Sequence, residues 1–153
     1  MKKILSVLLA VLMLASLVLT MTACGGDADV EVSLPAALAN VTKADVPELS
    51  GSAWELSGGM VDGVEMEYDD VNTVLENFGG SMNFIFGEDN KVMLSNGEKA
   101  LESTYTVTDK DLYMDFNEYK YHAVFTVIEE LNIMIVANDT EPNSALYFSS
   151  IEG

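Results

Sequence analysis

The fold is decided by residues 81–127, which read SMNFIFGEDNKVMLSNGEKALESTYTVTDKDLYMDFNEYKYHAVFTV. Apolar and polar side chains alternate along this stretch with the period of two that is typical of half-buried β-strands. The runs are separated by turn signals at Gly87–Asn90, Asn96-Gly97, Asp109-Lys110 and Asn117-Glu118. Because such short turns connect neighbouring strands, the stretch predicts an antiparallel meander of hairpins.

Further strands are predicted on both sides of this stretch, at Ala53–Leu56, Leu131–Ala137 and Ala145–Ile151. Leu131–Ala137 is almost continuously apolar, which predicts that other parts of the chain cover both of its faces. In all, about eight strands follow one another at turn spacing, as in antiparallel sandwiches and barrels. An eight-stranded meander loses its exposed edges when it closes on itself. We therefore expect an all-β fold with one short helix, an antiparallel up-and-down meander closing into a small barrel.

The one helix is predicted within residues 69–80, DDVNTVLENFGG. Its apolar residues recur at i, i+3, i+4 and i+7, which gives one apolar stripe: Val71, Val74, Leu75 and Phe78. Asp69 or Asp70 is expected to cap the start of the helix, and Gly79 suits the left-handed residue that follows its end.

Seven aromatic side chains are predicted to line the barrel interior: Trp54, Phe84, Phe86, Phe116, Tyr121, Phe125 and Phe148. If a small apolar ligand binds inside the barrel, these residues are its expected contacts. An eight-stranded barrel is also just wide enough to be filled by side chains of this size. Both a filled core and a ligand cavity therefore stay open.

The N-terminus has the layout of an export signal. Lys2 and Lys3 precede an apolar run of about 16 residues, residues 4–19, and small residues follow it. A membrane-spanning helix, the alternative, needs roughly 20 apolar residues. Residues 21–24, Met-Thr-Ala-Cys, resemble the lipobox of bacterial lipoproteins, with Met21 where that family usually has leucine. The resemblance implies cleavage between Ala23 and Cys24 and attachment of fatty acids such as palmitate to Cys24, whereas a free thiol is the alternative.

The sequence is thus expected to divide into three parts. Residues 1–23 are the lipoprotein signal peptide, residues 24–50 a lipidated N-terminus with a flexible tether, and residues 51–153 the barrel domain. The tether is predicted because residues 25–50 contain Pro35 and Pro47 and no aromatic side chain. A flexible chain of this length spans on the order of 30 Å. The expected location is the cell membrane, with the domain anchored by lipid on the extracytoplasmic side of the bacterial cell envelope.

Charge excludes one class of partner. Residues 24–153 carry 25 acidic side chains against 5 lysines, a formal −20, and the chain has no arginine. Phosphate backbones repel such a protein, so we expect no nucleic-acid partner. The single cysteine excludes an internal disulfide framework and a cysteine-based zinc site.

Two features could carry chemistry. The acidic cluster of Glu65, Glu67, Asp69 and Asp70 offers oxygen ligands of the kind that Ca²⁺ takes, but its spacing does not fit an EF-hand loop. A solvated acidic loop is the favoured interpretation, and no metal or other cofactor is expected. His122, the one histidine, falls on the outer face of its strand by alternation, and we expect it to be a surface residue.

Residues 51–153 resemble small lipocalin-like bacterial lipoproteins in having Trp54 in the first strand after Gly51, an Asp62-Gly63 turn, one helix and a long meander. Lipocalins usually have Gly-x-Trp, and here the spacing is one residue longer. The arginine that packs on this tryptophan in the family has no counterpart in the chain. The resemblance implies a lipocalin-like barrel with a binding role.

The expected function is a lipid-anchored, extracytoplasmic binding protein that is not an enzyme and holds a small apolar ligand. The alternative is an envelope module with a filled core that contacts another protein. A hydrolase is third, because the sequence holds no Gly-x-Ser-x-Gly or His-Glu-x-x-His motif. The expected partners are thus the membrane, through the N-terminal lipid, and either an apolar ligand or an envelope protein.

Overall fold

The computed structural model describes residues 35–117 and 119–151. The elements in this part of the chain are η2 (Ala36–Leu38), β1 (Ala53–Val61), β2 (Val64–Glu65), α2 (Tyr68–Phe78), β3 (Asn83–Phe86), β4 (Lys91–Ser95), β5 (Ala100–Thr108), β6 (Asp111–Asp115), β7 (Lys120–Ile128), β8 (Leu131–Asn138) and β9 (Ala145–Ile151). The predicted strands are all present. β1 is longer than expected, and β2 is a two-residue extension beyond its turn.

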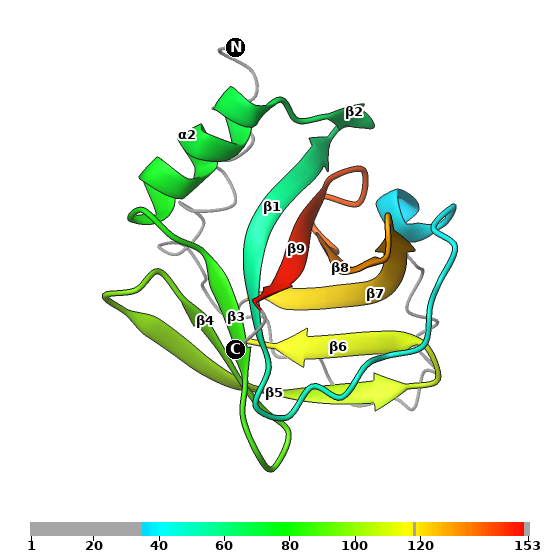
Figure 1. Cartoon of the computed structure of the whole chain (residues 1–153), viewed down its shortest axis with the longest axis vertical. Coiled ribbons are helices and arrows are strands. Elements are labelled where there is room, and N and C mark those ends of the chain that lie inside the picture. Colours follow the sequence, from blue (N-terminus) through cyan, green and yellow to red (C-terminus); the bar gives the residue numbers. More distant parts are fainter. Residues whose placement is uncertain (1–34, 118, 152–153) are drawn as a thin grey trace, which may run out of the picture. The chain divides into compact units, whose positions relative to one another are not determined.

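The strands form one closed antiparallel barrel (Figure 1). β1 and β3 to β9 pair in chain order, and β9 then pairs with β1, so these eight strands close into a barrel. β2 pairs only with the end of β1. The predicted fold class, an all-β meander that closes with one helix, is confirmed.

The register places large apolar side chains opposite one another inside the barrel. Trp54 on β1 lies opposite Phe84 on β3. On the other side, Phe148 of β9 lies opposite Leu56 of β1 and Met134 of β8. A shift of one residue would turn every one of these side chains outward, so the apolar alternation specifies the register.

Helix α2 lies beside the part of β1 that no longer pairs with β3. β1 pairs with β3 only through Ala53 to Glu55, and farther along, β1 pairs with β9 and β2. α2 packs on β1, and its predicted stripe is buried at Val71 and Val74. The Asn96 amide at the β4–β5 turn donates a hydrogen bond of 2.8 Å to the Phe78 carbonyl at the other end of the helix.

The helix ends are set by one expected and one unexpected residue. Gly79 ends the helix with φ 114°, the left-handed conformation predicted for it. The N-cap, however, is Glu67, two residues before Asp69 and three before Asp70. Asp70 instead accepts a hydrogen bond of 3.1 Å from the Glu67 backbone N–H, so it supports the cap from within the first turn.

Residues 35–52, which we call the strap, lie against the barrel, and the tether predicted for residues 24–50 is wrong for this part. Leu38 and Leu49 are buried. The backbone N–H of Ala44 donates to the Phe125 carbonyl at 2.7 Å, and that of Gly51 to the Phe86 carbonyl at 2.8 Å. The strap is held because it satisfies backbone groups and covers apolar side chains, although its prolines and lack of aromatics suggested a linker.

The strap covers a second apolar cluster on the outside of β7, β8 and β9. Leu38 packs there on a set of buried residues comprising Val124, Ile133, Ile135, Ala137 and Ala145. β8 is consequently buried on both faces, as its continuous apolar run predicted. The described residues form one compact unit, so the barrel, the strap and both apolar clusters belong to a single domain.

The turn between β7 and β8 stores backbone strain. Glu129 and Glu130 have φ of 50° and 70°, although neither is a glycine or an asparagine. The left-handed region costs an ordinary residue roughly 1–2 kcal/mol. We expect the double substitution Glu129→Asn and Glu130→Gly to raise the free energy of unfolding by about 1–2 kcal/mol, because Asn-Gly suits a turn with two positive φ angles. Urea unfolding measures this.

The matched control for this turn is the pair Glu129→Gln and Glu130→Gln. It removes the same two charges and leaves both residues with ordinary side chains at positive φ. If this control stabilises the protein as much as the Asn-Gly turn does, charge repulsion rather than backbone strain is the cause.

No helix in the described ranges is long and apolar enough to cross a membrane. The predicted signal peptide, the cleavage site at Ala23 and Cys24, and the first part of the predicted tether lie outside those ranges. Those expectations stay predictions.

Candidate functional site

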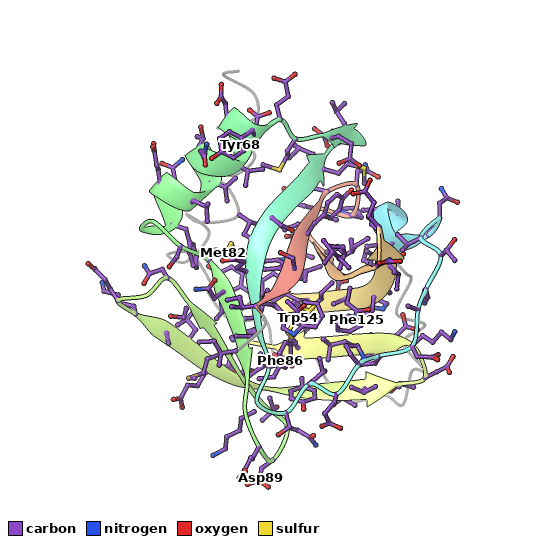
Figure 2. All side chains as sticks on the ribbon, viewed as in Figure 1. Trp54, Tyr68, Met82, Phe86, Asp89 and Phe125 are labelled. Atoms are coloured by element: carbon purple, nitrogen blue, oxygen red, sulfur yellow. The ribbon has the colours of Figure 1, made fainter. Side chains whose placement is uncertain are left out.

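The seven aromatic residues predicted for the barrel interior are all placed there, and six of them meet another member of the set ring to ring. Trp54 meets Phe125 edge to face, with ring centroids 5.3 Å apart (Figure 2). Phe84 is the centre of a second group, with the rings of Phe148, Tyr121 and Phe116 at 4.9, 6.1 and 6.3 Å. These separations are those of packed aromatic pairs. The rings therefore fill the space in which a ligand was expected.

Burial agrees with this close packing. The largest side chains that solvent does not reach include Trp54, Phe84, Phe86, Phe125 and Phe148. Phe86 completes the set by meeting Tyr105 edge to face at 5.2 Å. Burial also raises the pKa of Tyr121 to about 12, so its hydroxyl stays neutral inside the barrel.

Trp54 is held differently from the tryptophan of the lipocalin pattern. Its indole Nε1 donates a hydrogen bond of 3.0 Å to the hydroxyl of Ser52, and Ser52 Oγ donates in turn to the Leu49 carbonyl at 2.6 Å. These two consecutive hydrogen bonds link the indole to the strap. The indole N–H is thus satisfied by Ser52.

The acidic cluster is divided among separate roles. Glu65 accepts a hydrogen bond of 3.0 Å from the Tyr147 hydroxyl, whereas Glu67 and Asp70 form the helix cap. Asp69 lies in the first turn of α2, where the helix dipole favours a negative charge. Within residues 35–117 and 119–151, no group of three or more His, Cys, Asp and Glu side chains is arranged to hold a metal ion.

His122 lies on the outer face of β7, as predicted, but it is buried rather than on the surface, with 2% of its area exposed. Its Nε2 lies 2.7 Å from a carboxylate oxygen of Asp111, and its ring packs on Tyr113 with centroids 4.5 Å apart. Lys43 of the strap donates to the same Asp111 oxygen at 2.7 Å. The prediction of a surface histidine was wrong because the strap covers this face.

Asp111 joins the barrel to the strap electrostatically. Partial burial of its carboxyl would raise the pKa, but hydrogen bonds from Lys43 and His122, with the charges of these groups, outweigh burial and hold the pKa below its ordinary 3.8. Among the described residues, His122 Nδ1 has no hydrogen-bond partner. A buried histidine fixed between a carboxylate and a tyrosine ring fits a structural role, because substrate cannot reach it.

Asp111→Asn is expected to lower the free energy of unfolding by about 1.5–3 kcal/mol, the usual value of hydrogen bonds to a charged group. The folded-state pKa of Asp111 is lowered, so its contribution is complete above about pH 3.8 and is lost as the pH falls through the folded pKa. Urea unfolding of the wild type and the variant from pH 7 to pH 2.5 should therefore show a difference that shrinks only at the acid end.

Asp45→Asn is the matched control. Asp45 also joins the strap to the barrel, through Lys110 at 3.2 Å, but its side chain is 93% exposed. Exposed ion pairs contribute at most about 1 kcal/mol. Equal losses in the two variants would contradict a special role for Asp111.

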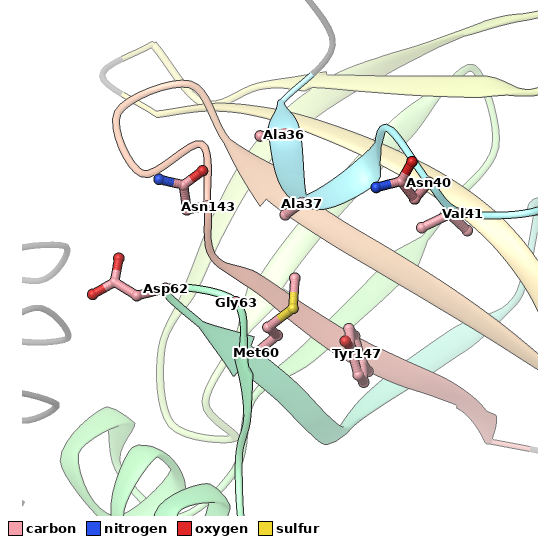
Figure 3. Close-up of a pocket in the computed structure, with 9 residues that line it drawn as sticks. All are labelled: Ala36, Ala37, Asn40, Val41, Met60, Asp62, Gly63, Asn143 and Tyr147. Atoms are coloured by element: carbon pink, nitrogen blue, oxygen red, sulfur yellow. The ribbon is translucent and has the colours of Figure 1, made fainter.

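An open pocket of about 400 Å³ lies outside the barrel interior, between the strap and the strands β1 and β9 (Figure 3). The strap contributes Ala36, Ala37, Asn40 and Val41. The opposite wall consists of Met60 and Tyr147 on β1 and β9, with Asp62, Gly63 and Asn143 from the adjoining turns. Its volume falls in the range of small-molecule sites.

A bulge in β1 shapes the floor of this pocket. The register with β9 shifts between Leu56 and Gly58, after which Gly59 and Val61 point inward and Met60 lies on the outer side. The Tyr147 ring lies over Gly58, where a Cβ atom would come within 3.3 Å of it. The Tyr147 hydroxyl is fixed by Glu65. Burial and this carboxylate raise the pKa of Tyr147 to about 12, so the floor carries a neutral phenol.

The end of the pocket between the β1–β2 turn and the β8–β9 loop is fixed by hydrogen bonds from the backbone. Gly63 donates its N–H to the Asn143 carbonyl at 3.2 Å, and the Asp62 N–H donates to Ser144 Oγ at 3.2 Å. These bonds fix the β1–β2 turn to the β8–β9 loop. Sequence reasoning missed this pocket, because its walls come from three segments that no motif links and because residues 36–41 were assigned to a tether.

The fold and these contacts define a small closed antiparallel β-barrel, with aromatic rings packed inside it and a strap on its outer face. Comparisons of the chain with profiles of known protein families, with curated proteins and with solved structures found no match.

Proposed function

We propose that this protein is a lipid-anchored, extracytoplasmic binding protein, without enzymatic activity, whose filled barrel is a scaffold for a ligand site on its outer side. The observation that carries the proposal is the contrast between two places in the domain. The interior is occupied by its own aromatic rings, and the pocket beside Tyr147 is open. A small ligand thus finds room at the strap and not inside the barrel.

The anchor is the acylated Cys24 that the lipobox resemblance implies. Because the strap begins at Pro35, residues 24–34 are all that separates this cysteine from the folded domain. Eleven residues span at most about 40 Å even when fully extended. The pocket, which begins one residue later at Ala36, would therefore work close to the membrane surface.

The proposed absence of catalysis is supported by the surroundings of His122. The strap covers it, and its carboxylate partner is engaged by Lys43 as well. A general base must come within hydrogen-bond distance of the proton that it abstracts. His122 lies beneath a packed layer, where a substrate does not reach.

An envelope protein as partner is the second candidate, and one observation favours it. Ile128 and Leu131 face each other across the β7–β8 turn, and both are more than half exposed. Ile151 of β9 is also exposed. Apolar side chains grouped on a surface commonly mark contacts with other proteins.

Native mass spectrometry of the mature protein, isolated from the membranes of its source cells, tests the leading proposal. The wild type should carry a small molecule in addition to its acyl chains. Ala36→Trp should abolish this mass, because an indole at this position enters the pocket. Ala39→Trp should retain it, because Ala39 is also exposed on the same short turn but does not line the pocket. A wild type without added mass, or a ligand retained by Ala36→Trp, would contradict the proposed site.

A further inference from the structure

The polar lining of the pocket beside Tyr147 includes a negative charge and no positive charge. Asp62 carries a carboxylate at the rim, where its side chain points away from Met60 and Tyr147 (Figure 3), and Asn40 and Asn143 carry amides. None of its nine lining residues is a lysine or a histidine. Within the described ranges, the carboxylate of Asp62 and the side-chain amide of Asn40 take no part in a hydrogen bond, so both are free to meet a ligand. An ionised carboxylate accepts hydrogen bonds and cannot donate them. The polar end of the pocket is therefore suited to a ligand that donates hydrogen bonds.

The negative charges near the pocket further restrict the class of ligand that it can bind. Glu65 lies next to the floor of the pocket, where it holds the Tyr147 hydroxyl. Asp62 and Glu65 are thus two negative charges at one side of the pocket, in a mature chain of formal charge −20. An anionic ligand would be repelled both locally and by the whole domain, whereas a cation would be attracted.

The remaining surface of the pocket is apolar. Met60 and Val41 contribute aliphatic side chains, and the Tyr147 ring offers its face. Since burial of apolar area contributes roughly 25 cal/mol per Å², most of the affinity would come from an apolar body lying here. An aromatic face also attracts a cation placed over it.

We infer that the pocket binds an ammonium group carried on a small apolar body, with the ammonium near Asp62 and the apolar body against Met60, Val41 and Tyr147. This inference rests on the proposed function, because it names the chemical class of ligand for the same site. It requires a donor-rich, positively charged head group, which the apolar interior of the barrel would not select.

Three probes that share a phenyl body test the head group: 2-phenylethylammonium, 2-phenylethanol and 3-phenylpropanoate. Each is titrated into residues 25–153, which contain the whole compact unit, at low ionic strength so that charge is little screened. Amide shifts in ¹H–¹⁵N spectra report binding at Gly63, Asn143 and Tyr147. The ammonium should bind about two- to fivefold more tightly than the alcohol, the value of one exposed ion pair, and the carboxylate should not saturate.

Asp62→Asn should bring the affinity for the ammonium down to that for the alcohol. The substitution keeps the turn, because Asn-Gly is favoured where both central φ angles are positive, as they are at Asp62 and Gly63. Asp89→Asn is the matched control, since Asp89 also has a positive φ and lies in the β3–β4 turn at the other end of the barrel. It should leave the preference unchanged.

The outcomes separate this inference from the proposed function. If all three probes shift the pocket amides equally, the pocket is a binding site and the ammonium class is wrong. If Asp62→Asn and Asp89→Asn reduce the preference equally, the overall charge and not Asp62 selects the cation, and the placement of the head group is wrong. If none of the probes shifts these amides, both the inference and the proposed site fail.

Discussion

Phe84→Ala is expected to lower the free energy of unfolding by about 3–5 kcal/mol, the cost of removing a large aromatic ring from a packed core. Phe84 is almost completely buried and contacts three other rings, those of Phe116, Tyr121 and Phe148. Its loss removes apolar burial and leaves a cavity that these neighbours cannot all close. Since small domains are stable by only about 5–15 kcal/mol, the effect is large. Urea unfolding of residues 25–153 measures it.

Two further variants make this prediction specific. Tyr68→Ala also removes a whole aromatic ring, but Tyr68 is 80% exposed at the start of α2, so a change within about 0.5 kcal/mol is expected. Phe84→Leu keeps most of the volume and should cost less than Phe84→Ala, which keeps the prediction measurable if the alanine variant does not fold. A loss for Phe84→Ala as small as that for Tyr68→Ala would contradict the packed interior.

Cys24→Ser is expected to reduce incorporation of labelled palmitate from full to background. The serine hydroxyl cannot take the place of the thiol that the lipobox resemblance assigns to the acyl group. Without acylation, the variant should also retain residues 1–23, so gel mobility and intact mass give a second measurement. A stable anchor needs more than one fatty chain, and the variant would have none.

Met21→Leu is the control for this experiment, because it moves the lipobox closer to the residues usual in that family. It should be acylated and cleaved at least as well as the wild type. If Cys24→Ser still incorporates palmitate, or if the wild type does not, the lipid anchor fails and the location proposed for the protein fails with it.

The barrel could be predicted from the sequence because its signals are local. Alternation along residues 81–127 set the strands, and turn residues such as Asn96-Gly97 separated them. Gly97 indeed has φ 89°, and Gly79 ends the helix at φ 114°, as their positions required. Closure was predicted because an eight-stranded meander that stays open exposes two unpaired edges, whereas a closed barrel exposes none.

The strap could not be recognised from its own residues. Two isolated side chains, Leu38 and Leu49, and several backbone groups make its contacts. Backbone hydrogen bonds of this kind cannot be inferred from amino-acid composition. The signal that pointed to it lay elsewhere, in the continuous apolar run of β8, which needed a cover on its outer face. Following that requirement to residues 35–50 would also have shown that His122 is buried, because the same cover lies over it.

The pocket beside Tyr147 was beyond sequence reasoning for a different reason. Its walls depend on a one-residue bulge in β1, which reverses the direction of the side chains after Leu56. Alternation predicts faces only while the register is unbroken. Met60 and the turn at Asp62 therefore reached the outer wall through a local irregularity that alternation alone does not reveal.

Titration of benzene into residues 25–153 tests directly whether the barrel is filled. The wild type should show no saturable shifts of amides in the strands around Phe84 and Phe125. Phe84→Ala should gain them, because dry cavities left by deleted core side chains bind benzene. Saturable binding of benzene by the wild type, with shifts at these interior strands, would contradict the filled barrel and return the ligand to the inside.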